Sequence, residues 1–391
     1  MIFQLEKSQI QIQKAVRDFV KGEFKKDIID RLLEQHEFPQ KIWSKACELG
    51  FVGIHYPEQY DGEGLSPFEN VLVAEELCRG DASVGTCIAK AGWGAGMILR
   101  YGTETQKKTW LSKVTKGEVL SGLALYEPGL GSDVALCQSS AEKDGDAWIV
   151  NGTKSFVING GPLTGVYIIL CRTTPESVSV DQSFSTILIE ADRPGITTVD
   201  VGHRLGAHLI NVNEVRFDQV RVPLDNLIGT EGRGLAQING YMNETRIFSA
   251  AQSLGIAQGA FDRSFAYVKK REQFGRKIVD FEITRQKLAD MATKIEASRL
   301  LTYQGAWFLN QSEGIEKLSA MAKWYTARSA VEVCDEAIQL LGGYGYIQEY
   351  EVERFYRDAK VEDVLDGTEI LQKNIIANDF VKGKLISFSK I

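Results

Sequence analysis

The sequence predicts an α+β fold with an N-terminal helical domain, a central β-domain of barrel or sandwich type, and a C-terminal four-helix bundle. Helical patterns fill residues 1–120 and 233–391, whereas strand patterns fill residues 121–232. Strands gathered in one block do not fit an alternating βαβ order. The length of 391 residues allows two or three domains, and the three zones favour three, with these boundaries.

The first zone is predicted to be helical. Ile12, Ala15, Val16 and Phe19 recur at the spacing of one helical face. A turn-rich stretch at 56–67 then interrupts the helical pattern.

The second zone is predicted to be built from strands. Asp144-Gly145 and Asn151-Gly152 each lie between β-prone runs, which is a strong local signal for a hairpin. The runs at 166–172, 185–191 and 214–222 are predicted to be further strands.

The third zone is predicted to contain four long helices separated only by turn residues. Their expected ranges are 234–271, 280–311, 314–341 and 367–383.

Composition excludes several classes of protein. The net charge of −7 gives no electrostatic reason to expect nucleic acid or an anionic membrane as a partner. The six cysteines form no CxxC pair and indicate a reducing compartment. The first residues show no targeting segment, and the apolar run near 166–171 is too short to cross a bilayer. We therefore expect a soluble cytoplasmic protein.

Motifs of several common enzyme classes are missing from the sequence. It contains no GxGxxG, P-loop, HExxH or GxSxG pattern. His203 and His208 are spaced loosely, and surface or hydrogen-bonding roles suit them better than metal ligation. We expect no metal site.

Three loops have both an ordinary and a functional interpretation. The Pro-Gly-x-Gly-Ser loop at 127–133 can be a tight turn or a cradle for a phosphate. The segment 271–276 can be a charged helix end, or its arginine can pair with a pyrophosphate while its phenylalanine covers a ring. The glycines at 339–346 can cap a helix or allow close approach of a nucleotide.

Asp366 also has two interpretations. It precedes Gly367, Thr368 and Glu369, which resembles a helix N-cap followed by an acidic residue. Alternatively, it is a buried general base beside the apolar pair Val364-Leu365.

Together these segments resemble the acyl-CoA dehydrogenase family, whose members use FAD to oxidise acyl-CoA thioesters between Cα and Cβ. The similarity covers essentially the whole chain, and the matching motifs occur in the family's order: EPGLGSD at 127–133, NGTKSFVINGG at 151–161, REQFG at 271–275, QLLGGYGY at 339–346 and RDAKVEDVLDGTEILQ at 357–372. The resemblance implies the three-domain fold described above, a homotetramer, and an electron-transferring flavoprotein as electron acceptor.

The resemblance also implies roles for individual residues. The loop 123–132 would run under the flavin, Phe156 would lie against its ring system, and Arg271 and Phe274 would grip the ADP half of an FAD bound to a neighbouring subunit. The full set of implied FAD contacts is Leu123, Leu125, Tyr126, Ser132, Phe156, Ile158, Arg271, Phe274, Gln339, Gly343 and Thr368. The implied substrate contacts are Ser132, Asn243, Arg246 and Gly367.

Asp366 stands where most of the family places a catalytic glutamate. Some members carry the base just before the residue equivalent to Arg246, but that place is Thr245 here, and Glu244 is about 100° away around a helix. The resemblance therefore favours Asp366 as the base that removes the α-proton, with the β-hydrogen leaving as hydride to flavin N5.

Three departures from the family pattern bear on the substrate. Asp366 is one methylene shorter than glutamate, Ile158 replaces a hydroxyl residue near the flavin, and Tyr126 replaces a small threonine. Because mispositioning on that scale is costly, we expect a branched or alicyclic acyl group such as that of cyclohexane-1-carboxyl-CoA. The alternatives are a nitroalkane-oxidase-like flavoenzyme that uses Asp366 as base, and a non-catalytic scaffold protein with the flavin fold.

Overall fold

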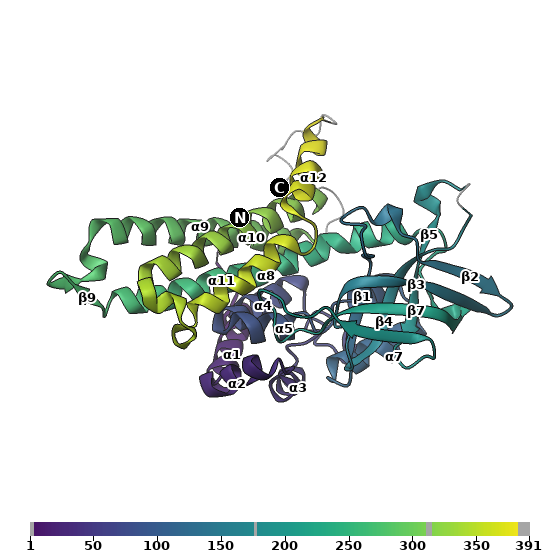
Figure 1. Ribbon diagram of the computed structural model, residues 1–391, viewed down its shortest axis with the longest axis horizontal. Coiled ribbons are helices and arrows are strands. Elements are labelled where there is room, and N and C mark those ends of the chain that lie inside the picture. The colour runs from purple at the N-terminus through teal and green to yellow at the C-terminus, as the bar shows by residue number, and fades with distance from the viewer. Residues whose placement is uncertain (1–3, 176–177, 310–314, 382–391) are drawn as a thin grey trace.

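The computed structural model describes residues 4–175, 178–309 and 315–381, and Figure 1 shows their arrangement. The predicted helix boundaries between 310 and 314 and beyond 381 lie outside the described residues. Long helices occupy one end of the molecule and the sheet occupies the other, with the N-terminal helices packed beneath both (Figure 1).

The N-terminal zone is helical, as predicted. Ser66 caps the N-terminus of α4 in a capping box with Glu69, and Pro67 occupies the first turn, so the turn-rich stretch ends there. The helices are α1 (Lys7–Glu23), α2 (Lys26–Gln35), α3 (Gln40–Glu48), α4 (Pro67–Gly80), α5 (Ala82–Ala89), α6 (Ala95–Tyr101) and α7 (Glu104–Thr115).

The middle zone forms an eight-stranded mixed sheet in the order β6-β7-β3-β2-β4-β5-β8, with β1 parallel to β4. Its strands are β1 (Leu120–Ala124), β2 (Ser140–Asp144), β3 (Ala147–Ile158), β4 (Thr164–Arg172), β5 (Phe184–Glu190), β6 (Ile196–Asp200), β7 (Val212–Pro223) and β8 (Leu227–Ile228).

Of the two predicted hairpins, one is confirmed and the other is wrong. The turn at Asp144-Gly145 joins β2 to β3. Asn151-Gly152 instead lies inside β3, where the pairing with β7 shifts register. Gly152 has a φ of 146°, and a Cβ there would lie 2.2 Å from the Ser139 hydroxyl. The glycine therefore serves a bulge and a close approach of backbone to side chain, and not a turn.

Strand β4 is buried on both faces, which explains its continuous apolar run. Tyr167 and Ile169 face a core enclosed by the sheet, together with side chains of β3, β5 and β7. Ile168 and Leu170 face the opposite way, into the core shared with the N-terminal helices. Because side chains alternate along a strand, one strand connects the two cores.

The C-terminal zone contains one helix that was not predicted. Val352, Phe355, Ala359 and Glu362 repeat at helical spacing and are buried along α11, so the signal was present in the sequence. The helices are α8 (Gly234–Val268), α9 (Glu282–Phe308), α10 (Ile315–Leu341), α11 (Val352–Val364) and α12 (Glu369–Val381), and the hairpin between α8 and α9 has strands β9 (Glu272–Gln273) and β10 (Arg276–Lys277). The short 3-10 helices are η1 (Glu58–Tyr60), η2 (Val134–Leu136), η3 (Val180–Gln182), η4 (Leu224–Asn226), η5 (Ile278–Asp280), η6 (Gly342–Tyr346) and η7 (Gln348–Tyr350).

Helix α8 is the central element of the bundle. Between Glu244 and Ala257 every residue except Phe248 is buried, so this helix is enclosed on all sides. Gly255 permits the closest contact, since a Cβ there would lie 2.2 Å from the backbone oxygen of Glu75 on α4.

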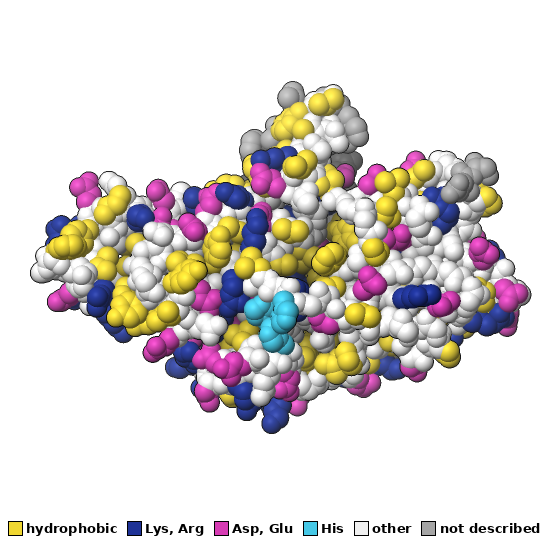
Figure 2. Space-filling model, viewed as in Figure 1, with side chains coloured by type: hydrophobic (Ala, Val, Ile, Leu, Met, Phe, Trp, Pro, Cys, Tyr) yellow, Lys and Arg dark blue, Asp and Glu magenta, His cyan; other side chains and the backbone are white. Residues whose placement is uncertain are grey.

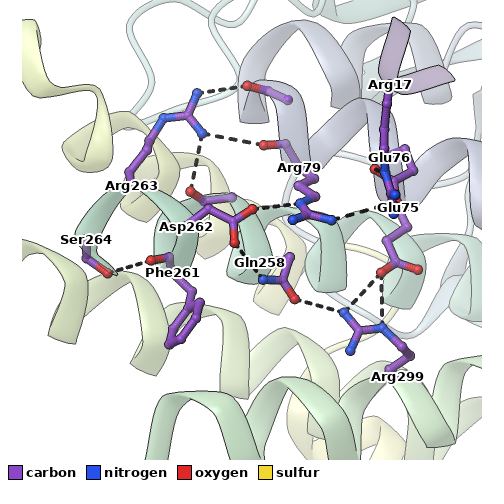
Figure 3. Close-up of polar contacts among 12 residues, drawn as sticks. Arg17, Glu75, Glu76, Arg79, Gln258, Phe261, Asp262, Arg263, Ser264 and Arg299 are labelled. Carbon is purple, nitrogen blue, oxygen red and sulfur yellow. Dashed lines mark hydrogen bonds and ion pairs between the residues drawn. The ribbon is translucent and has the colours of Figure 1, made fainter. Parts of the chain in front are cut away.

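A seam of polar contacts joins α4 to the bundle, as Figure 3 shows. Arg79 of α4 donates to Asp262 of α8 at 2.7 Å, and Arg299 of α9 donates to Glu75 of α4 at 3.2 Å. Gln258 bridges these two pairs, donating to Asp262 and accepting from Arg299, each at 2.9 Å. Because partly buried charges are costly when unpaired, this network specifies how α4 sits against α8 and α9.

Replacing Gly255 with alanine should force α4 away from α8. We expect Gly255→Ala to lower the free energy of unfolding by about 1–3 kcal/mol, the usual cost of overpacking. Chemical denaturation of the purified protein measures this change. Gly22→Ala on α1 is the matched control, because a Cβ there meets no atom of the described residues within 4 Å. A Gly255→Ala protein as stable as the control protein would contradict the close contact.

Candidate active site

Asp366 lies in a strained turn between α11 and α12. Its φ is 57° and that of Gly367 is 92°, both in the left-handed region. The carboxylate is buried, and Oδ2 has no hydrogen-bond partner among the described residues. The cap of α12 is Thr368, whose hydroxyl accepts from Leu371 N–H at 3.4 Å. The helix-cap interpretation of Asp366 is therefore wrong, and its carboxylate is left with an open acceptor.

Two side chains clamp the backbone of this turn. Gln372 Nε2 donates to the carbonyls of Asp366 and Gly367 at 2.8 and 3.1 Å. Lys323 Nζ donates to the Gly367 carbonyl at 2.8 Å and to the Asp363 carbonyl at 3.2 Å. A Cβ at position 367 would lie 2.7 Å from Gln372 Nε2, so the clamp requires glycine there. These contacts hold a conformation that would otherwise be costly.

The electrostatic environment makes Asp366 a stronger base than ordinary aspartate. Burial raises its pKa to about 6; the nearby Glu362 carboxylate adds to this, while Lys90, Lys323 and Arg246 oppose it. Lys90 and Glu362 form a buried ion pair at 3.1 Å. The carboxylate is consequently ionised at neutral pH and still basic enough to accept a proton.

Arg246 and Tyr126 share this environment. Arg246 is buried, donates to the Asn243 side chain at 2.9 Å, and has no partner for Nε among the described residues. Burial raises the pKa of the Tyr126 phenol to about 12, and the Asp366 carboxylate contributes to that rise. An arginine of predicted substrate-binding role and a tyrosine of predicted flavin-binding role thus lie within electrostatic range of Asp366.

The two residues weighed as alternative bases have other partners. Glu244 accepts two hydrogen bonds from Arg100, at 3.0 and 2.9 Å. Thr245 donates its hydroxyl to the Met242 carbonyl at 3.2 Å. Arg100 therefore holds the Glu244 carboxylate through its Oε2, and Thr245 has no carboxylate.

The predicted flavin loop is shaped by a buried carboxylate. Glu127 pairs with Lys154 at 2.8 Å and accepts from the Gln138 and Ser139 backbone at 2.8 and 2.9 Å. Burial alone would raise the pKa of Glu127, but Lys154 and these hydrogen bonds lower it to about 2. The glutamate of the EPGLGSD motif therefore organises the loop from inside, while Ser132 remains exposed.

The other residues of this predicted FAD surface lie on or near the loop. Leu123, Leu125 and Ile158 are buried in the core shared with the N-terminal helices. Phe156, in contrast to these buried residues, is 67% exposed. It has a φ of 51° and lies at a bulge of β3. An exposed aromatic residue held in the left-handed region is unusual and suits a surface that stacks on a planar ligand.

A second group of predicted FAD contacts lies at the opposite end of the molecule, where β9 is labelled in Figure 1. Phe274 and Gly275 have φ values of 52° and 76°, as a two-residue hairpin turn requires, and Phe274 is 93% exposed. Arg271, Gln339 and Gly343 line a groove beside this hairpin. One copy of the chain therefore does not bring the two groups together.

Both surfaces fit the parts of an FAD molecule. Gly129 and Gly131 have positive φ and open space where a Cβ would stand, so backbone at the loop is accessible to a phosphate. Arg271 and the glycines Gly342 and Gly343 offer a cation and open backbone at the distal groove.

Sequence reasoning missed the supporting residues Lys90, Lys323, Glu362 and Gln372. Lys90 did carry a signal, since it is a lone charge in the apolar run CIAKAGWGAGMIL of the sequence. Nothing local indicated that Gln372 would reach the Asp366 turn.

Within the three described ranges, no helix has the length and apolar character needed to cross a bilayer. Within the same ranges, no group of three or more histidine, cysteine or acidic side chains is arranged to hold a metal ion.

Removing Lys154 should leave a buried carboxylate without its counter-charge. We expect Lys154→Met to lower the free energy of unfolding by about 3–5 kcal/mol. Urea denaturation measures the loss. The double variant Glu127→Gln, Lys154→Met is the control, and it should recover part of the stability because no unpaired charge remains. Equal stability of the single variant and the wild type would contradict the role given to this pair.

Comparison with known proteins identifies the family. Models of three acyl-CoA dehydrogenase domains match the chain in order: the N-terminal domain over residues 6–118, the middle domain over 122–220 and the C-terminal domain over 232–380. A probable acyl-CoA dehydrogenase of Bacillus subtilis is 35% identical over 98% of this chain and 100% of its own length.

Two further proteins show the same relationship. The CarC subunit of the caffeyl-CoA reductase–Etf complex of Acetobacterium woodii is 35% identical over 95% of this chain and 97% of its own. The structure of butyryl-CoA dehydrogenase from Megasphaera elsdenii superimposes with a TM-score of 0.91 at 32% identity, covering 97% of this chain and 100% of that one. The chain belongs to the acyl-CoA dehydrogenase family, the FAD-dependent oxidoreductases that act on the CH–CH group of acyl-CoA thioesters.

Proposed function

We propose that Asp366 is the catalytic base of this enzyme and that the acyl group of its substrate is branched or alicyclic, as in cyclohexane-1-carboxyl-CoA. The observation that carries the proposal is the buried Asp366 carboxylate, whose Oδ2 has no partner among the described residues. A base must be able to accept a proton at an unoccupied oxygen.

The protein's own residues contribute position, desolvation and proton transfer. Asp366 takes the proton from Cα of the thioester, and its raised pKa reduces the cost of that transfer. Gln372 and Lys323 keep the turn rigid, and the partly buried Leu365, Tyr126 and Trp93 limit access of water. FAD, when bound, supplies the acceptor for the β-hydrogen.

The rigid turn also supports the choice of acyl group. Because two clamps hold the backbone, Asp366 cannot readily advance to replace the methylene that glutamate would provide. The substrate must then present Cα closer to the carboxylate. A branch or ring at Cα changes where the acyl group places Cα in the site, and a straight chain lacks that effect. This difference supports a branched or alicyclic substrate.

The proposal includes a homotetramer in which each FAD is held by two copies of the chain. Its support is the separation of the two groups of FAD contacts (Figure 1). Hydrophobic side chains also gather on the surface of the bundle end that carries β9 (Figure 2). They include the exposed Phe274, Ile283, Tyr344, Tyr346 and Ile347. Exposed apolar surface of this kind is typical of a protein interface.

An electron-transferring flavoprotein is the proposed acceptor of the electrons. Support comes from the Acetobacterium woodii relative, which is a subunit of a complex with Etf. The proposed location is the cytoplasm, and its support is that all six cysteines are free and buried.

The identity of the base can be tested by pH and mutation. We expect kcat/KM to fall about tenfold per pH unit below an apparent pKa of about 6, because the base must be deprotonated to act. Asp366→Asn should slow anaerobic bleaching of the flavin by about 10²–10⁴-fold. Asp290→Asn, at an exposed position on α9, is the control and should match the wild type. Bleaching of the Asp366→Asn enzyme at the wild-type rate would refute the assignment.

The substrate class can be tested by restoring the missing methylene. Anaerobic titration of the wild type should show faster bleaching by cyclohexane-1-carboxyl-CoA than by butyryl- or octanoyl-CoA. Asp366→Glu should shift this preference towards the straight chains by up to about 10²-fold, because the longer side chain changes the reach of the base. Faster turnover of straight chains by the wild type would overturn the alicyclic proposal. Rapid reoxidation by air with no bleaching by any acyl-CoA would instead favour a nitroalkane-oxidase-like activity.

The clamp on the Asp366 turn can be tested separately. Gln372→Met removes two hydrogen bonds to the turn and should lower kcat about 10–100-fold, with a smaller change in KM. Steady-state kinetics with an artificial electron acceptor separate the two constants. Asn374→Ala, on the exposed side of α12, is the control. An unchanged kcat in Gln372→Met would show that the turn keeps its position without the clamp.

A further inference from the structure

A small cavity lies between the N-terminal helices and α8. Its volume is about 50 Å³, and its polar wall is formed by His55, Asn70, Glu244, Thr245 and Gln252. On this measure about 10–15 Å³ is enough for one water molecule, so there is room for a few non-hydrogen atoms.

The cavity wall has unused hydrogen-bonding capacity. His55 is buried, and among the described residues neither of its ring nitrogens makes a hydrogen bond of good geometry, although the Asn70 side chain lies close enough to raise its pKa. Gln252 is 1% exposed, and its Oε1 also lacks a partner in that part of the chain. The Glu244 carboxylate lies 4.0 Å from His55 Nε2, beyond hydrogen-bond distance. Since buried polar groups are rarely left unpaired, two of them in one wall indicate a ligand with polar atoms.

The charges around the cavity limit what this ligand can be. Arg100 neutralises Glu244 through two hydrogen bonds, and no lysine or arginine is among the described lining residues. Burial lowers the pKa of His55, so the imidazole is neutral and has one donor and one acceptor nitrogen. The cavity therefore suits neither a carboxylate nor an ammonium group. An uncharged hydroxyl, which both donates and accepts, matches His55 together with the free Gln252 oxygen.

The cavity borders the catalytic site. Trp93 lines it, and the Lys90 ammonium lies 4.9 Å from the centre of the Trp93 ring. The same Lys90 forms an ion pair with Glu362, and its charge lowers the pKa of Asp366. On α8, Thr245 lines the cavity, and the charge of its neighbour Arg246 lowers the pKa of Asp366. Tyr241 also lines the cavity, and the Asp366 carboxylate contributes to the raised pKa of its phenol, so this wall lies within electrostatic range of Asp366.

From this geometry we infer that the acyl group of the natural substrate carries a hydroxyl group remote from the thioester, and that His55 and Gln252 are specificity-determining residues that bind it. The inference rests on the proposed function in one respect: Asp366 marks the thioester end of the bound acyl group. It does not depend on whether the acyl skeleton is a ring or a chain.

Two matched pairs of substrates test the inference on the FAD-loaded enzyme. One pair is cyclohexane-1-carboxyl-CoA and 4-hydroxycyclohexane-1-carboxyl-CoA; the other is hexanoyl-CoA and 6-hydroxyhexanoyl-CoA. Anaerobic titration gives the bleaching rate and, from the spectral change on binding, a dissociation constant for each. We expect the hydroxylated member of at least one pair to be preferred by about tenfold or more, because a site built to bind a hydroxyl rejects the analogue that lacks it.

Variants assign the preference to the cavity. Gln252→Met, and His55→Phe, which retains the ring packed against Tyr56 and Phe248, should each reduce about tenfold the ratio by which the hydroxylated substrate is preferred over the unsubstituted one. Gln258→Met is the matched control, because this glutamine lies on α8 with its amide bound to Arg299 and Asp262. It should leave the preference unchanged.

The outcomes separate this inference from the proposed function. Equal bleaching rates and dissociation constants for both members in both pairs, or a preference that survives Gln252→Met, overturn hydroxyl recognition. Bleaching by none of the four overturns the proposed function, while the dissociation constants still report on the cavity. Faster bleaching by the chain pair than by the ring pair overturns the alicyclic proposal alone, since the ratio within the chain pair still reports on the cavity.

Discussion

The burial of charged groups around helix α8 is the constraint on which the rest of this structure depends. Glu244 is buried on this helix, and Lys90, Glu362 and Lys323 are buried beside it; each is compensated by an ion pair or by hydrogen bonds. Unpaired charges there would cost several kcal/mol each, so the positions of α4, α10 and α11 relative to α8 are closely specified. Asp366 differs from these four, because among the described residues its Oδ2 has no hydrogen-bond partner and its carboxylate has no ion pair. The hydrogen bonds that Gln372 and Lys323 make to the turn hold Asp366 in this unpaired position.

The turn at Asp366 shows how the fold decides between two roles that the local sequence allows for this residue, a helix cap and a carboxylate that caps no helix. A carboxylate before a helix normally caps it, and a capping carboxylate has its acceptors occupied. Here the left-handed conformation of Asp366 and Gly367 moves the cap to Thr368. Gln372, one turn into α12, then holds the strained backbone in place. The Asp366 side chain is thereby not used as the cap, and α12 still begins with a capped N-terminus.

The predicted FAD surfaces show the same dependence on distant parts of the chain. The loop at 127–133 takes its shape from Lys154 on β3, and Phe156 projects from a bulge of that strand. The hairpin that carries Phe274 lies at the far end of the bundle (Figure 1). Assembly of copies is therefore as much a part of the proposed site as the folding of one chain.

Periodicity and motif order in the sequence alone determined the three zones, the family resemblance and the candidate residues, because helical and strand spacing and the glycine-rich loops are local properties. The tertiary structure alone decided that Asp366 Oδ2 has no partner among the described residues and does not cap α12, that Asn151-Gly152 forms a bulge, and that Lys90, Lys323 and Gln372 lie around the Asp366 turn. It also decided that His55 and Gln252 share one cavity. The physical reason is that burial, pKa and unpaired hydrogen-bonding groups arise from neighbours far apart in the sequence, which no local pattern records.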